Sequence, residues 1–201
     1  MIVNVNFAQP VGIYNNFINK CVGKFCHCEV SVEIDIGQFR VLVDNALNDA
    51  FSPSLCQTIL NNTESMSGTH TLAFYILFGG VVSVRFLDEA NEDPFYQPIQ
   101  DEIYDVIPMK VEEEQFYEII SWHIKHLGRS YDIPKALFSV TPFFPWQAAV
   151  PEKFFCSQLV MYMVRNNNMW EVSRNLNIDH MSPDAVYEWL LSTVDFNEDE
   201  L

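Results

Sequence analysis

Two apolar runs, 71–78 and 81–86, constrain the fold of this chain more than any other feature. Gly79 and Gly80 separate them, and adjacent glycines favour a tight turn between paired strands. Neither run approaches the ~18 apolar residues that a membrane-spanning helix requires. The pattern therefore predicts a β-hairpin inside a core sheet, and we expect no integral membrane segment.

A further strand is predicted over 26–34, where valine and isoleucine alternate with polar residues. Because side chains alternate between the two faces of a strand, His27 and Glu29 share one face and Cys28 lies on the other. The sequence therefore predicts a strand with His27 and Glu29 on one face and Cys28 and Val30 on the other.

Cys156 stands at the start of an apolar helical pattern that runs on from Phe154 and Phe155. The free N–H groups and the positive end of a helix dipole lower the pKa of a thiol in that position. The thiolate is the nucleophilic form, so Cys156 is a candidate nucleophile. Another helix is predicted from Glu112 to Gly128, where apolar residues recur at helical spacing behind three glutamates.

A thiol nucleophile needs a base and a group that orients the base. His27 is the candidate base because it begins a predicted strand. A second strand is predicted over 39–44, after a turn at 35–38, and it would carry Asp44 beside His27. Glu29, two residues along the same strand as His27, is the alternative orienting group.

The order of these parts, with the histidine on an early strand and the cysteine on a late helix, resembles the circularly permuted NlpC/P60 papain-like superfamily. Within it, the chain is most similar to the YiiX-like branch, whose cysteine motif is usually Tyr-Cys-Ser-Glu-Leu-Val. The landmarks, in order, are His27, a next strand ending Val43-Asp44-Asn45-Ala46, Gly128-x-x-Tyr131-Asp132, Phe155-Cys156-Ser157-Gln158-Leu159-Val160 and Ser182-Pro183-Asp184-Ala185. Gln158 in place of the usual glutamate is a departure from the motif.

The resemblance implies an α+β papain-like fold, in which an antiparallel sheet packs with helices. It also implies a cysteine-dependent hydrolase, a peptidase or amidase, that cleaves amide or ester bonds through a thioester. Cys156 would be the nucleophile, His27 the general base and Asp44 the orienting group, while Tyr131 would line the cleft. Substrates in the family are peptides, peptidoglycan-like molecules or lipid esters, and no cofactor or metal is implied.

The segment 138–146 is too rich in aromatic residues and proline to form a regular helix or a central strand. Exposed aromatic patches usually mark binding surfaces. Two interpretations stay open: a hydrophobic substrate-binding lip that includes Trp146, or a loop that closes over the core.

Composition favours one domain over residues 1–201, because 49% hydrophobic residues in a chain of this length can form a single core. The formal net charge is −16, from 11 Lys and Arg against 27 Asp and Glu. Such a surface repels nucleic acid and anionic membranes, so we expect no nucleic-acid partner. A protein partner that is basic or neutral remains compatible with the charge.

The five cysteines are odd in number, and polar residues from Asn4 to Gln9 interrupt the apolar N-terminal run, so no secretory signal pattern is present. We therefore expect a reducing compartment, either the cytoplasm or a virion. The spacing of Cys21, Cys26 and Cys28 points alternate sulfurs to opposite faces of a strand, which favours packed thiols over a zinc site.

His123 and His126 lie three residues apart on the predicted helix, with no carboxylate near them in the sequence. We expect them to be surface or cleft residues rather than metal ligands.

Two alternatives to a hydrolase stay open. One is an acyltransferase or lipid-processing enzyme that uses the same cysteine and histidine. The other is a non-catalytic structural or host-interaction protein that retains the fold, as the occurrence of related permuted domains in large DNA viruses implies.

Overall fold

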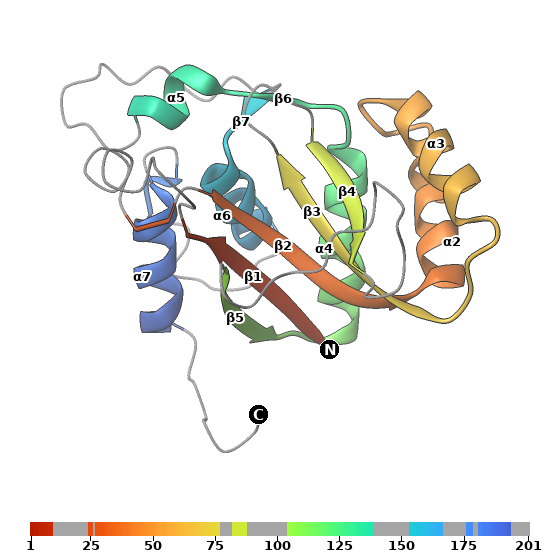
Figure 1. The fold of residues 1–201 in the computed structure, drawn as a ribbon, viewed down its shortest axis with the longest axis horizontal. Helices are drawn as coiled ribbons and strands as arrows, with labels where there is room; N and C mark the ends of the chain where they lie inside the picture. Colours follow the sequence, from red (N-terminus) through yellow and green to blue (C-terminus); the bar gives the residue numbers. More distant parts are fainter. Residues whose placement is uncertain are drawn as a thin grey trace.

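A five-stranded antiparallel sheet forms the centre of the protein in the computed structural model (Figure 1). The structure describes residues 1–9, 24–25, 27–76, 82–87, 104–138, 153–166, 176–178 and 181–193. In spatial order the strands are β4 (Val82–Leu87), β3 (Thr69–Ile76), β2 (His27–Asp35), β1 (Ile2–Ala8) and β5 (Tyr104–Lys110). The strand predicted over 26–34 is confirmed as β2. The predicted hairpin is confirmed as β3 and β4, which pair from Thr71 opposite Leu87 to Ile76 opposite Val82.

β1 lies between β2 and β5, and its successive side chains point to opposite faces of the sheet. Val3, Val5 and Phe7 are fully buried on one face. The other face of β1 carries Asn6, which is also fully buried and stands opposite Glu29 of β2. One face of the sheet is therefore apolar, and the other holds buried polar groups where β1 and β2 meet.

Helices cover the apolar face of the sheet. α4 (Glu113–Lys125) reaches Phe74 of β3 through His123, and α7 (Pro183–Thr193) reaches Phe7 of β1 through Tyr187. α6 (Cys156–Asn166) packs against both of these helices and against β2. Figure 1 shows α4 and α6 behind the sheet, with α7 beside the end at which β2 begins.

The remaining elements lie around this layer. They are α2 (Ile36–Ala46), α3 (Pro53–Thr63), α5 (Ile133–Phe138), β6 (Ser130–Tyr131) and β7 (Lys153–Phe154). α2 packs against α3 and α4, while β6 and β7 form a short parallel pair. The α+β class, with an antiparallel sheet and helices packed on it, is confirmed. In the described part of the chain, no helix combines the length and the apolar character needed to span a membrane.

Residues 39–44 are helical, so the predicted second strand is wrong. Asp35 caps α2, since its Oδ1 accepts the N–H of Gly37 at 2.9 Å and that of Gln38 at 3.2 Å. The buried residues of α2 recur at helical spacing and are Ile36, Phe39, Val43 and Ala46. The β-branched residues suggested a strand, but a capping aspartate followed by this spacing stabilises a helix.

The helix predicted from Glu112 to Gly128 is confirmed as α4. Glu112 and Gln115 form a capping box at its start. After its end, Gly128 has φ of +89°, and a Cβ there would overlap the side chain of Ser52. Glycine is required at this position both by the backbone conformation and by the close approach to the start of α3.

Candidate functional site

Cys156 is the first residue of α6, as the sequence predicts. The helix is entered from β7, and the Phe155 carbonyl accepts the first α6 hydrogen bond, from Leu159 N–H at 2.9 Å. Cys156 is only 2% exposed. Its thiol therefore lies at a helix N-terminus, where backbone N–H groups have no acceptor within the helix and the dipole favours a negative charge.

The Cys156 thiol is in hydrogen-bonding contact with two residues at the start of β2, Cys28 and His27. The contact with Cys28 does most to hold the pKa of Cys156 well below its ordinary value, burial opposes it, and His27 adds to it. Burial lowers the pKa of His27, but its contacts with Cys156 and Glu29 outweigh burial and raise the pKa to about 9. Both shifts favour a thiolate beside an imidazolium over a neutral thiol beside a neutral imidazole.

Glu29 is the acidic residue that lies next to His27. Its Oε2 is 3.7 Å from His27 Nε2, and its side chain is 2% exposed against 18% for His27. Next to Glu29, on the same polar face, Asn6 donates from Nδ2 to Ser31 Oγ at 2.9 Å. Because His27 and Glu29 are two residues apart on one strand, the alternation of side chains brings them together.

Asp44 does not lie beside His27, and that prediction is wrong. The prediction depended on a strand over 39–44, whereas Asp44 is an exposed residue of α2. His27 begins β2 and α2 starts beyond its other end, so about 26 Å of strand separates His27 from Asp35. Of the two acidic candidates, only Glu29 is placed to orient the imidazole.

Tyr131 lies next to the strand that leads to the nucleophile. It stands opposite Phe154 in the pair of β6 and β7, and it is half-buried against the core. The following Asp132 donates its N–H to the Phe154 carbonyl at 2.7 Å. Its carboxylate accepts the Lys135 N–H at 3.2 Å at the start of α5. Trp146, predicted as part of a substrate lip, lies outside the described residues.

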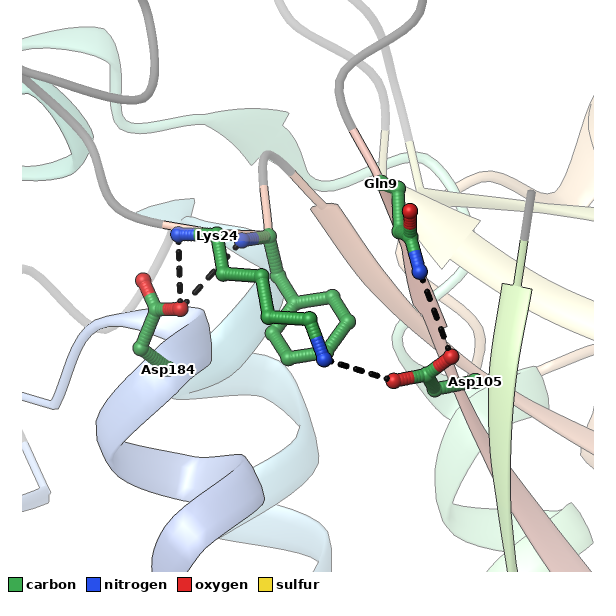
Figure 2. Close-up of polar contacts among 5 residues, drawn as sticks. Gln9, Lys24, Asp105 and Asp184 are labelled. Atoms are coloured by element: carbon green, nitrogen blue, oxygen red, sulfur yellow. Dashed lines mark hydrogen bonds and ion pairs between the residues drawn. The ribbon is translucent and has the colours of Figure 1, made fainter.

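The start of α7 contacts both chain segments of the site, and sequence reasoning missed this. Figure 2 shows Asp184 Oδ1 accepting the backbone N–H of Lys24 at 2.8 Å and that of Phe25 at 3.3 Å. Ser157, the residue after Cys156, donates its hydroxyl to the Met181 carbonyl at 2.7 Å. We call residues 181–184 the α7 corner. The motif around Asp184 predicts a helix start, but nothing in it identifies distant backbone partners.

His123 is fully buried, so its prediction as a surface or cleft residue is wrong. Its Nδ1 is 2.8 Å from the Ile119 carbonyl, and its ring centroid lies 4.8 Å from that of Phe74. Burial lowers the pKa of His123 to about 4. His126 is half-buried and stacks on Trp122 at 4.0 Å.

Three of the cysteines, Cys28, Cys56 and Cys156, fall within the described chain, and all three are buried and outside disulfide bonds. Cys21 and Cys26 lie outside the described residues. Among the residues that the structure describes, no three His, Cys, Asp or Glu side chains gather as a metal site. Gln158, the departure from the family motif, is fully buried in α6.

No model of a known protein family, no curated protein and no solved structure matches this chain. The geometry of the site is therefore the basis for its function.

Proposed function

We propose that this protein is a cysteine-dependent hydrolase of amide or ester bonds, with Cys156 as the nucleophile and His27 as the acid and base. One observation carries the proposal: a thiol of depressed pKa at a helix N-terminus contacts an imidazole whose pKa is raised to about 9. Catalytic sites often hold two groups in contact whose pKa values are shifted strongly in opposite directions. The substrates would be peptides, peptidoglycan-like molecules or lipid esters.

We also propose that the fold is the circularly permuted papain-like fold of the NlpC/P60 superfamily. The support is the order of its parts along the chain. The histidine begins an early strand of an antiparallel sheet, and the cysteine begins a late helix packed on that strand. The motif residues from Gly128 to Asp132 include β6, the strand that pairs with β7 directly before α6.

Acylation would begin when the Cys156 thiolate attacks the substrate carbonyl carbon. The carbonyl oxygen gains negative charge, and free N–H groups at the start of α6 would stabilise it. As the C–N or C–O bond breaks, the His27 imidazolium gives its proton to the leaving amine or alkoxide. The products of this step are a thioester on Cys156 and a neutral His27.

Deacylation would then use water. Neutral His27 takes one proton from a water molecule while the water oxygen attacks the thioester carbonyl carbon. The C–S bond breaks, the acid is released, and the thiolate and imidazolium are restored. Glu29, with its carboxylate 3.7 Å from Nε2, would orient the ring and stabilise its positive charge.

The first test is the rate of iodoacetamide alkylation at each cysteine as a function of pH, read by mass spectrometry. Cys156 should react fast well below the pKa of about 8.5 of a free thiol. Cys56 is a matched control in the same chain, since it is buried but burial raises its pKa. A Cys156 rate that follows pH in the same way as Cys56 would contradict the proposal.

The second test is catalysis on a panel of amide and ester substrates. Turnover should be accompanied by an acyl adduct on Cys156 in the intact mass spectrum, and Cys156→Ala should abolish both. Cys56→Ala should leave both in place. Hydrolysis that persists in Cys156→Ala would sink the assignment of the nucleophile.

The burial of Cys156 favours one alternative, a non-catalytic protein in which the ion pair only stabilises the fold. With 2% exposure, the thiol would then be protected from reagents in the native state. The same alkylation series separates the two functions. Labelling of Cys156 that requires denaturant would support the non-catalytic protein, and labelling of the native protein supports the hydrolase.

A further inference from the structure

The α7 corner joins the two chain segments that make up the site. Asp184 binds the backbone at residues 24–25, just before β2, across a sequence separation of 160 residues. The hydroxyl of Ser157 binds the corner at Met181, which ties it to the first turn of α6. His27 and Cys156 are therefore each within a few residues of a hydrogen bond to the same short segment.

We infer that Asp184 is a positioning residue that sets the start of β2 at the distance from α6 at which His27 contacts Cys156. The inference rests on the proposed function, because it assigns Asp184 a role in forming the ion pair. Asp184 touches neither reacting atom, and acts through the backbone of Lys24 and Phe25.

Asp184 is itself held firmly. Pro183 opens α7, and Ser182 Oγ accepts the Ala185 N–H at 3.3 Å, so the first turn of the helix is capped. A carboxylate in this turn is favoured by the helix dipole. The side chain therefore presents a fixed acceptor oxygen to a segment from the opposite end of the chain.

Packing around residues 24–25 reinforces the backbone contact. Phe25 is buried, and its ring centroid lies 5.4 Å from that of Phe7 and 4.7 Å from that of Tyr187 on α7. The side chain of Lys24, in contrast, is 60% exposed and pairs with Asp105 at 3.2 Å (Figure 2). An exposed ion pair of this kind contributes little, so the bonds from Asp184 to the backbone are the ones that position the strand.

The experiment compares Cys156 alkylation across pH and the His27 pKa, followed by NMR, in the wild type and in Asp184→Ala. Loss of the Asp184 acceptor oxygen should move the pH profile of Cys156 alkylation to higher pH by about one unit. The alkylation rate near pH 6 should therefore be roughly tenfold lower. The pKa of His27 should fall from about 9 toward 6.5. Asp184→Asn keeps an acceptor oxygen and should behave as the wild type. Asp105→Asn removes the charge that faces Lys24, keeps an oxygen that can accept from Gln9, and is the matched control.

A folded Asp184→Ala protein with the wild-type profile and His27 pKa would overturn the inference, as would an Asp184→Asn protein that fails in the same way as Asp184→Ala. If Asp184→Ala does not fold, Ser157→Ala decides, since it removes the other bond to the corner. Its profile should shift in the same direction, and an unchanged profile overturns the inference. A wild-type Cys156 that alkylates no faster than Cys56 contradicts the proposed function instead, and the His27 pKa still decides the role of Asp184.

Discussion

His27 and His123 are both withdrawn from solvent, yet their pKa values move in opposite directions. The pKa of His27 is raised to about 9, and that of His123 is lowered to about 4. His27 contacts Cys156 and Glu29, two groups that carry negative charge when ionised. The ring of His123 bonds to a backbone carbonyl and packs against aromatic rings.

The difference teaches that burial alone does not identify a functional histidine. Burial disfavours the charged form of both rings, and only the ring with anionic partners overcomes it. His123 is a buried residue of α4, and its contacts are those of a core residue. The charge of the neighbours therefore separates the candidate base from a structural histidine of the same type.

The largest expected effect comes from removing each ring in turn. In His27→Ala, the Cys156 pKa should return toward that of a free thiol, which lowers its alkylation rate at pH 6 by on the order of 100-fold. His123→Leu removes a buried ring without touching the pair, so the alkylation rate should stay at the wild-type value. Both rates come from mass spectrometry of the labelled peptide. Equal losses in the two variants would erase the distinction between the histidines.

The second prediction concerns the free energy of unfolding below pH 6.5. The unfolded chain binds a proton at His123 with a pKa of 6.5, whereas the folded protein does so only near pH 4. Stability from neutral His123 is therefore full above pH 6.5 and is lost as the pH falls toward 4, by up to about 3 kcal/mol. Urea unfolding at several pH values should show a steeper loss in the wild type than in His123→Leu. Parallel curves would contradict the lowered pKa.

The ion pair should behave differently above pH 6.5. Folding raises the pKa of His27 and lowers that of Cys156, so between about pH 6.5 and about pH 8.5 the proton gained and the proton lost offset each other. The pair then adds no pH dependence to stability within that window. Above it, the unfolded thiol also ionises, and the contribution of His27 is lost as the pH rises through about 9.

Cys28→Ala is expected to have a smaller effect. Its thiol makes the contact that lowers the pKa of Cys156 most, so its removal should slow alkylation at pH 6 by about tenfold without abolishing it. The His27 contact would remain and would keep Cys156 more reactive than Cys56. Complete loss of Cys156 labelling in Cys28→Ala, with the fold intact, would show that the two cysteines had been assigned in the wrong order.

The smallest expected effect is that of Glu29→Gln. The carboxylate lies 3.7 Å from the imidazole, so neutralising it should lower the His27 pKa and slow Cys156 alkylation at pH 6 by a few-fold, roughly the effect of half a pKa unit. Asp44→Asn is the matched control, because Asp44 is exposed on α2. A shift in Asp44→Asn alone would restore the interpretation that the helix overturned.

The elements with their own local pattern could be predicted from the sequence. The β3 and β4 hairpin, β2, α4 and the starts of α6 and α7 all follow from spacing and capping residues. No strand is predicted over β1, although Val3, Val5 and Phe7 alternate with asparagines in the pattern of a strand. The prediction for α2 is wrong because its β-branched residues favour a strand, whereas the cap at Asp35 favours a helix.

The site was harder to predict because it depends on contacts between distant segments. The pairing of Cys156 with His27 is predicted from a thiol at a helix start and a histidine at a strand start, supported by the resemblance to a family, and the structure brings the two into contact. The strand predicted over 39–44 favours Asp44 over Glu29 as the orienting group, and that strand is a helix in the structure. The bonds from Asp184 to residues 24–25 involve backbone groups, which look the same in every sequence.

The role inferred for the α7 corner also bears on when His27 and Cys156 can come into contact during protein synthesis. His27 leaves the ribosome early, Cys156 much later, and Asp184 later still. A nascent chain therefore carries His27 for most of its synthesis without Cys156, and the cysteine emerges before the segment that ties its helix to β2. The role inferred for Asp184 implies that the contact between His27 and Cys156 is complete only once α7 docks, so a half-made chain would not yet hold the thiol of depressed pKa.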